Sequence, residues 1–233
     1  MRYKTETKKD HYDIGLREYL IAVYKNMSFA LLVTSIISMA VASSQKLIDL
    51  LYGTSLIWVV LFAPIVMAIY IGRKLIFMSA SEAQTCLVIF AFLIGFSLSP
   101  IFLIYTGESI ARVFFIAAST FGAMSIYGQR TEKDLSSVGS FLIMGVLGLI
   151  IVGIINIFLQ SNTLQVITSI AGLGVFTLLT AYDSQKLKAL YYQGENHKLL
   201  SSLAVYGSLT LYMDFINIFI NLLRLIGVKR DEK

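Results

Sequence analysis

The sequence predicts an all-α fold, a polytopic membrane protein whose chain crosses the bilayer seven times. Its 233 residues are 57% hydrophobic and only 14% charged, whereas soluble domains are about 45–50% apolar and about 25% charged. The mean hydropathy of the whole chain is +0.75, which is too high for a water-soluble globule. Seven long runs without charge, one of them interrupted by a single aspartate, supply the membrane spans.

Each run approaches or reaches the roughly 20 residues, about 17–25 in practice, with which a helix crosses a bilayer core about 30 Å thick. The predicted spans are Met27–Ser43, Ser55–Ile71, Thr85–Tyr105, Val113–Tyr127, Val138–Phe158, Leu164–Tyr182 and Leu199–Leu223. The fourth run is short, so its helix is expected to begin near Ile110, with the Arg112 side chain reaching the interface. Pro64 and Pro100 fall inside spans, where we expect kinks because neighbouring helices can re-satisfy the freed carbonyls.

The distribution of lysine and arginine predicts the orientation, because cytoplasmic loops retain these residues. The N-terminal segment and the loops after spans two, four and six together hold thirteen of them, whereas the opposite loops hold two, Lys46 and Arg112. The N-terminus is therefore expected in the cytoplasm. The first span is expected to stay uncleaved, since the polar segment before it is too long for the start of a signal peptide.

Brief connections between the spans leave no room for a second domain. We expect residues 1–25 to form a cytoplasmic segment, residues 26–228 the transmembrane domain, and residues 229–233 a basic tail. Seven crossings place this basic tail on the outside, against the charge rule. A last segment that dips into the membrane and returns would avoid this, but 25 helical residues rise only about 37 Å, so one crossing is favoured.

Two aspartates lie in or at the edge of spans, where an ionisable residue costs about 2.5–3.5 kcal/mol on insertion scales and marks a candidate site. Asp214 lies in the middle of span seven and shares one helical face with other polar residues, at spacings of three and four. The members of this polar stripe are Gly207, Thr210, Asp214, Asn217, Asn221 and Arg224. Such a stripe lines a water-filled path or the bundle interior, so Thr210, Asn217 and Asn221 are pore-lining candidates. Alternatively, the asparagines hydrogen-bond across helices, for about 0.6 kcal/mol each.

Asp183, at the cytoplasmic end of span six, has two interpretations. It lies three residues before Lys186, and a surface ion pair at the interface is the simpler one. The other pairs it with Asp214. Two carboxylates in contact cannot both stay ionised in a low dielectric, so the pair would titrate as a unit, sense pH and hold calcium transiently through its oxygens. The two aspartates meet only if helix six runs on through Tyr192 toward Gly194.

Other chemistries are not indicated, and we expect neither enzymatic activity nor a cofactor. His11 and His197 lack the cysteine or acidic spacing of a zinc site. An intramembrane aspartyl protease is disfavoured, because its second aspartate should follow Gly-x-Gly, whereas Asp214 follows Leu211-Tyr212-Met213. The basic residues cluster between apolar runs and form no patch for nucleic acid. The partner expected from composition is therefore the lipid bilayer.

Three stretches carry a family resemblance: Tyr127–Ser136, followed by a glycine-rich span, Leu179–Lys186, and Leu209–Arg224. With residues 95–104 of span three, they resemble the Bax inhibitor (transmembrane Bax-inhibitor-motif) family in its bacterial form. The resemblance implies seven helices with the seventh at the centre of the bundle. It also implies an acid-sensitive calcium leak controlled by an aspartate pair on helices six and seven, whose positions match Asp183 and Asp214.

The resemblance further implies a latch, in which an arginine at the end of helix two holds the helix-six aspartate. Arg73 matches this arginine, with Lys74 as the competing residue. Acidification would protonate the aspartate pair, release Arg73 and open a path for calcium. The alternative is a regulator of a membrane-bound quality-control protease or of a cell-death or stress pathway, with the N-terminal segment as its cytoplasmic contact. The compact loops suit a bacterial inner (plasma) membrane.

Overall fold

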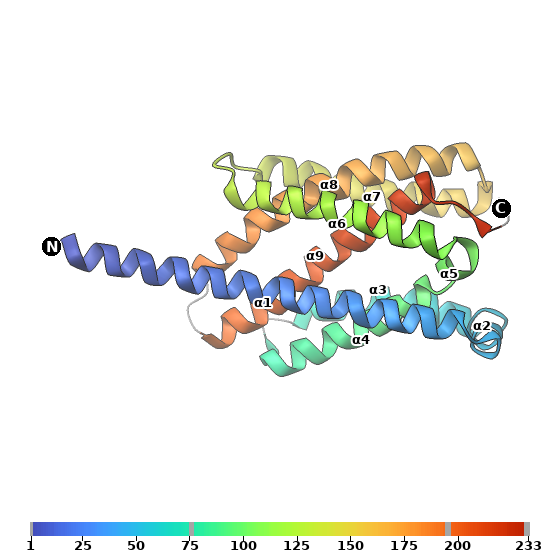
Figure 1. Cartoon of the computed structure of the whole chain (residues 1–233), viewed down its shortest axis with the longest axis horizontal. Helices are drawn as coiled ribbons and strands as arrows, with labels where there is room; N and C mark the ends of the chain where they lie inside the picture. The colour runs from blue at the N-terminus through green and yellow to red at the C-terminus, as the bar shows by residue number, and fades with distance from the viewer. Residues whose placement is uncertain (1, 75–76, 194–196, 231–233) are drawn as a thin grey trace. The chain divides into compact units, whose positions relative to one another are not determined.

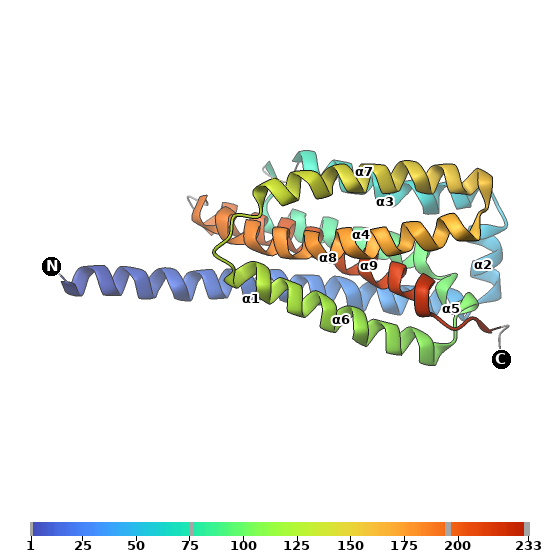
Figure 2. The same cartoon turned by 90° about the horizontal axis from the view of Figure 1, so that it is seen from above.

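The protein is almost entirely helical (Figures 1 and 2). The computed structural model describes the backbone of residues 2–74, 77–193 and 197–230, and the side chains of residues 14–74, 77–192 and 199–230. Within these ranges the helices are α1 (Arg2–Ala42), α2 (Gln45–Tyr52), α3 (Leu56–Lys74), α4 (Ala80–Leu98), α5 (Ile101–Ile104), α6 (Gly107–Arg130), α7 (Ser136–Leu159), α8 (Asn162–Gln193) and α9 (His197–Ile226). The all-α prediction is thus confirmed.

Seven segments of the described chain are long and apolar enough to cross a membrane, and each corresponds to one predicted span. They are Ile14–Ala42, Leu56–Lys74, Ala80–Ile104, Gly107–Arg130, Ser136–Leu159, Asn162–Tyr192 and Leu199–Ile226. The last of them, in α9, is the most buried: 56% of its most apolar window is buried, against 6–28% for the others. This burial agrees with the expected central position of the C-terminal helix.

The helices extend beyond the apolar runs that predicted them. Helix α1 is continuous from Arg2 to Ala42, whereas the sequence placed the first span at Met27–Ser43. Helix α8 runs on to Gln193, ten residues beyond Asp183. Hydropathy marks the part of a helix that suits lipid, and the hydrogen-bonded helix continues past it into polar sequence.

The two prolines have different consequences. Helix α3 continues through Pro64, which lies inside it. The third span is interrupted at Ser99 and Pro100, because α4 ends at Leu98 and α5 begins at Ile101. Helix α4 itself begins with a capping box, in which the Ser79 hydroxyl accepts from the Glu82 amide and the Glu82 carboxylate accepts from the Ser79 amide.

The chain divides into two compact units, and α8 and α9 contribute to both. The first unit contains residues 1–100 and 187–209. In it α4 packs against α1 and α3, and hydroxyl groups of α1 bond to α4 carbonyls: Thr34 Oγ1 donates to Ala91 O at 3.0 Å and Ser38 Oγ to Gly95 O at 2.8 Å. A Cβ on Gly95 would lie 2.8 Å from Ile37 Cβ, so glycine permits this close approach, as is usual between membrane helices.

The second unit contains residues 101–186 and 210–233. Its α7 and α8 form an antiparallel pair (Figure 2). The turn between them uses Gln160 in the left-handed region, with φ of 49°, and the Asn156 side chain accepts from Ser161 N at 3.0 Å. The chain after α9 is bound to the α5–α6 connection, since Thr106 N donates to Val228 O and Val228 N donates to Ser109 Oγ.

Candidate functional site

Asp183 of α8 and Asp214 of α9 lie together inside the second unit. They are 9% and 4% exposed, and their carboxyl groups lie close enough to interact with each other. The condition set by the sequence, that helix six continues past Tyr192, is met by α8. Two buried carboxyl groups from different helices are thus brought together in this unit.

The surroundings of the pair are polar on one side and apolar on the other. Lys186, one turn along α8, interacts with the Asp183 charge and also lies 5.9 Å from the centre of the Tyr182 ring. Asp214 is followed by Phe215, whose ring packs edge-on against Phe114 at 5.4 Å between centroids. Asp214 Oδ2 is buried and has no hydrogen-bond partner among the residues that the structure describes. Asp183 therefore neighbours both Lys186 and Asp214, but it is buried and forms no salt bridge with Lys186 in the described part of the chain, so the surface ion pair is not seen.

Small residues of α6 and α7 bring α8 close at the level of Asp183. A Cβ on Gly128 of α6 would lie 2.0 Å from the Ala181 carbonyl oxygen, and a Cβ on Gly139 of α7 would lie 2.3 Å from the Tyr182 ring. Between α6 and α8, the hydroxyl groups of Ser125 and Ser184 are hydrogen-bonded at 2.9 Å. Backbone contact of this kind fixes the position of the Asp183 carboxyl group.

Gln185 ties the α6–α7 loop to α8, beside the pair. Its Oε1 accepts from Leu135 N at 2.9 Å, and its Nε2 donates to Lys133 O at 2.8 Å. The stretches Tyr127–Ser136 and Leu179–Lys186, which carried the resemblance, thus meet in space. Sequence reasoning missed the roles of Gly128, Ser125 and Gln185, although two of the three lie within these stretches.

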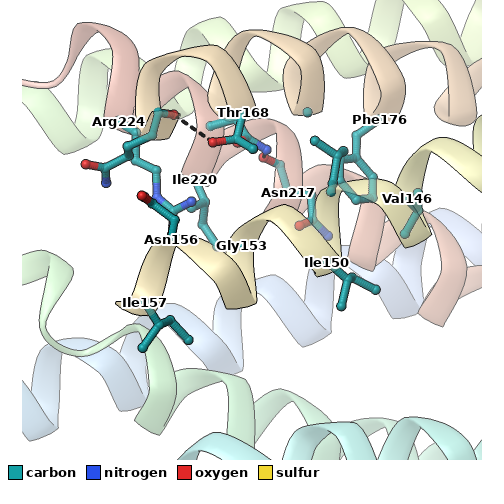
Figure 3. Close-up of a pocket in the computed structure, with 14 residues that line it drawn as sticks. Val146, Ile150, Gly153, Asn156, Ile157, Thr168, Phe176, Asn217, Ile220 and Arg224 are labelled. Atoms are coloured by element: carbon teal, nitrogen blue, oxygen red, sulfur yellow. Dashed lines mark hydrogen bonds between the residues drawn. The ribbon is translucent and has the colours of Figure 1, made fainter. Parts of the chain in front are cut away.

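Only some residues of the polar stripe on α9 line a cavity in the structure. Asn217 and Asn221 line a cavity of about 470 Å³ between α7, α8 and α9, with Arg224 at one end (Figure 3). Thr210 is half-buried, and neither it nor Asp214 lines this cavity. Gly172 of α8 makes room for Asn221, since a Cβ there would lie 2.8 Å from Asn221 Nδ2.

The two asparagines bond to their own helix. Asn217 Nδ2 donates to Met213 O and Asn221 Nδ2 donates to Asn217 O, both at 2.8 Å. Their amide oxygens accept no hydrogen bond from other residues that the structure describes. The expectation of cross-helix bonds is therefore not met within the described part of the chain, and the carbonyl end of each amide is left for the cavity.

The predicted latch residues belong to the other unit of the chain. Arg73 and Lys74 are exposed in the last turn of α3 and belong to the first unit, so the latch stays a prediction. No group of three or more histidine, cysteine, aspartate or glutamate side chains that could hold a metal occurs among the described residues. The side chains of His11 and His197 lie outside the described ranges.

Comparison with known proteins gives a match over nearly the whole chain. Residues 16–231 match the family described as inhibitor of apoptosis-promoting Bax1. An uncharacterised protein of Rickettsia prowazekii is 43% identical over 227 residues, which cover 97% of this chain and 96% of the relative. A protein of Caulobacter vibrioides is 38% identical over 229 residues, covering 94% and 92%. The inner membrane protein YbhL of Escherichia coli is 36% identical over 219 residues, covering 93% and 94%.

Proposed function

Because the chain belongs to the Bax inhibitor family and is a multi-pass membrane protein, we propose that it is a pH-sensitive calcium leak channel gated by Asp183 and Asp214. The observation that supports this is the burial of two neighbouring carboxyl groups from different spans. Intramembrane ionisable groups that pair with each other are typical of ion and proton pathways. No cofactor and no catalysis are part of this proposal, and calcium is the transported ion.

The number of protons on the pair sets its charge. With one shared proton the pair carries a single negative charge, with two it is neutral, and with none it holds two charges that repel each other. Acidification adds the second proton and removes the attraction of Asp183 for any cationic partner. In this proposal that partner is Arg73, with Lys74 as the competitor, and its release opens the path.

The amide oxygens of Asn217 and Asn221 suit the outer part of such a path. Calcium prefers oxygen ligands, and each asparagine keeps its carbonyl oxygen free because its Nδ2 bonds to the backbone four residues earlier. The carboxyl oxygens of Asp183 and Asp214 would hold the ion only in passing, since two carboxylates alone supply few of the six to eight ligands that calcium takes.

The location follows the relatives and the charge distribution. YbhL is named an inner membrane protein, and we place this chain in a bacterial inner membrane with its N-terminus in the cytoplasm, where thirteen of the lysines and arginines would then lie.

The test is calcium flux through purified protein in liposomes, at about pH 6 and about pH 8. The parent should leak faster at the lower pH. Asp183→Asn and Asp214→Asn keep the size of the side chain and remove its titration, so each should abolish the ratio between the two rates. Asp49→Asn is the matched control, because Asp49 is exposed on α2, and it should keep the ratio of the parent.

A flux that is the same at both pH values in the parent, or a pH ratio that survives both intramembrane variants, would refute the gating mechanism. Correct folding of each variant is checked by gel filtration and circular dichroism before flux is compared.

A second function, regulation of a membrane-bound quality-control protease, is favoured by the length of α1. Its 41 residues rise about 60 Å, twice the thickness of a bilayer core, so a long part of the helix lies outside the membrane. Tyr19 is buried and its hydroxyl donates to Leu203 O at 3.4 Å. A deletion should therefore stop at residue 13, to spare this contact. Such a deletion should remove regulation and leave calcium flux intact, and the reverse result would exclude the regulatory function.

A further inference from the structure

The cavity between α7, α8 and α9 has the size and lining of a ligand site. Its volume of about 470 Å³ falls in the range of about 300–1,000 Å³ that small-molecule sites occupy. Toward one end lie polar side chains from all three helices, Arg224, Asn156 and Thr168 (Figure 3), and Gln165 also lines the cavity. At the other end lie the apolar side chains of Val146 and Phe176 (Figure 3).

Arg224 brings an uncompensated positive charge to the polar end. Arg224 makes no hydrogen bond or ion pair with any residue that the structure describes. The salt bridge found among those residues joins Arg112 to Glu108 instead. The Arg224 side chain and that of Asn156 point toward one another (Figure 3). A guanidinium group presents a planar fork of donors that fits a phosphate or carboxylate.

The neighbouring amides supply further donors. Asn156 Oδ1 accepts from Ser161 N at 3.0 Å, which orients the amide and leaves its NH₂ group free to donate. The Gln165 side chain, which also lines the cavity, has no hydrogen-bond partner among the described residues. Asn221 lines the cavity and is 8% exposed, and its amide oxygen has no hydrogen-bond donor among the described residues, so it can accept from a hydroxyl or ammonium group.

The outer wall of the cavity is exposed to the bilayer. Ile150 and Ile157 line the cavity and are 52% and 69% exposed, in the span whose residues are least buried. The polar end lies near Leu159, where α7 ends, and the helix between Val146 and Leu159 rises about 20 Å. One leaflet of the bilayer core is about 15 Å thick, so the cavity can hold a headgroup at the interface and part of an acyl chain below it.

We propose that this cavity binds a membrane lipid with an anionic phosphate headgroup. Arg224 pairs with the phosphate, Asn156 and Gln165 donate to its oxygens, and one acyl chain lies along Ile150 toward Phe176. A soluble phosphate would use the charge and leave the apolar wall without a role, which is why the lipid is the occupant. The site stands on the cavity and its charge, and does not depend on the proposed leak.

The experiment uses quenching of tryptophan by brominated lipid. Trp58 is the only tryptophan, so Trp58→Phe gives a silent background into which Ile150→Trp places a reporter on the cavity wall. The protein is reconstituted in phosphatidylcholine that contains a minor fraction of phosphatidylglycerol with brominated chains. The quenching should correspond to a local concentration of anionic lipid about fivefold above that in the bulk bilayer. One favourable contact between an anionic lipid and a basic side chain provides an enrichment of about this size.

Three variants distinguish a specific site from general attraction of anionic lipid to a basic helix end. Phe158→Trp places the reporter near the end of α7 that carries Asn156, but outside the cavity lining. The Phe158 side chain is 82% exposed, so this reporter should be quenched according to the bulk lipid composition. Arg224→Gln should bring the Ile150 reporter to the same bulk value. Gly172→Val keeps the charge but adds a side chain against Asn221, and it should also remove the enrichment.

Equal quenching of the two reporters, or enrichment that survives Arg224→Gln in protein with parental circular dichroism, would overturn the proposal. Inorganic phosphate added to vesicles of the same mixture provides the last arm. If it displaces the brominated lipid from the Ile150 reporter, the site takes a soluble anion and the lipid assignment is wrong. If it does not, the acyl chain is needed and the assignment stands.

Discussion

The contact between α6 and α8 leaves no space for a side chain at Gly128, and the effect of adding one on stability can be measured. Gly128→Ala would put a Cβ 2.0 Å from the Ala181 carbonyl oxygen, and Cβ atoms essentially never come within 3.0 Å of a neighbour. The helices must therefore separate by about 1 Å. That movement would break the hydrogen bond between Ser125 and Ser184, which now measures 2.9 Å, and displace Asp183, two residues beyond Ala181.

The cost of this separation can be estimated. Overpacking costs about 1–3 kcal/mol and the lost hydrogen bond about 0.6 kcal/mol, while alanine recovers up to about 1 kcal/mol of helix propensity over glycine. The net loss of about 1–3 kcal/mol corresponds to a melting temperature lower by about 2–12 °C for a chain of this length. The assay is loss of helical circular dichroism on heating in detergent micelles.

Gly122→Ala is the matched control for Gly128→Ala. It makes the same substitution in the same helix, but a Cβ on Gly122 would meet nothing within 4 Å. Its melting temperature should stay the same or rise slightly because of the gain in helix propensity. If Gly128→Ala melts at or above the temperature of Gly122→Ala, the close packing of α6 on α8 is wrong as described here.

Three further predictions concern the surroundings of the pair and the stripe. Gln185→Leu removes both hydrogen bonds to the loop of residues 131–135, so amide hydrogen exchange there should accelerate about fivefold or more, for about 1 kcal/mol per bond, with no change in α7. The Ser136 side chain and amide hold the pKa of exposed Asp134 below its usual value. The ionised Asp134 carboxylate stabilises the fold above its unfolded pKa of 3.8, and this stabilisation is lost as the pH falls through the lower pKa of the folded state. Because Ser136→Ala removes the hydroxyl group, it should raise the pKa of Asp134 measured by NMR titration. Asn217→Leu should lower calcium flux at both pH values and leave their ratio unchanged, whereas a changed ratio would make Asn217 part of the sensor.

The sequence predicts what depends on local composition. The seven spans follow from runs of apolar residues, and the family follows from short motifs around Asp183 and Asp214. The end of α8 could not be read in this way, because the charged residues Asp183, Lys186 and Lys188 end the apolar run, whereas the hydrogen-bonded helix continues to Gln193. The meeting of the two aspartates depended on that extension.

Contacts between helices could not be predicted from local sequence for a different reason. Gly128 and Gln185 are ordinary residues in their own helices, and their roles arise only when Ala181 and the α6–α7 loop lie opposite them. The stripe on α9 was predicted as one surface, yet only its part from Asn217 to Arg224 lines the cavity. Periodicity establishes which residues share a face, and the neighbouring helices decide which part of the face is covered.

The lipid site and the proposed leak meet at Asn221, which gives a joint prediction. A lipid in the cavity covers the oxygens of Asn217 and Asn221, so calcium leak at acidic pH should be slower in vesicles that contain phosphatidylglycerol. Anionic lipid also concentrates calcium at the surface, which acts in the opposite direction. Arg224→Gln separates the two effects, because it removes the site and leaves the surface charge of the vesicle unchanged. The variant should therefore leak faster than the parent in anionic vesicles and equally fast in pure phosphatidylcholine. If parent and variant respond to anionic lipid in the same way, the lipid does not cover the ion path, whatever the quenching experiment finds.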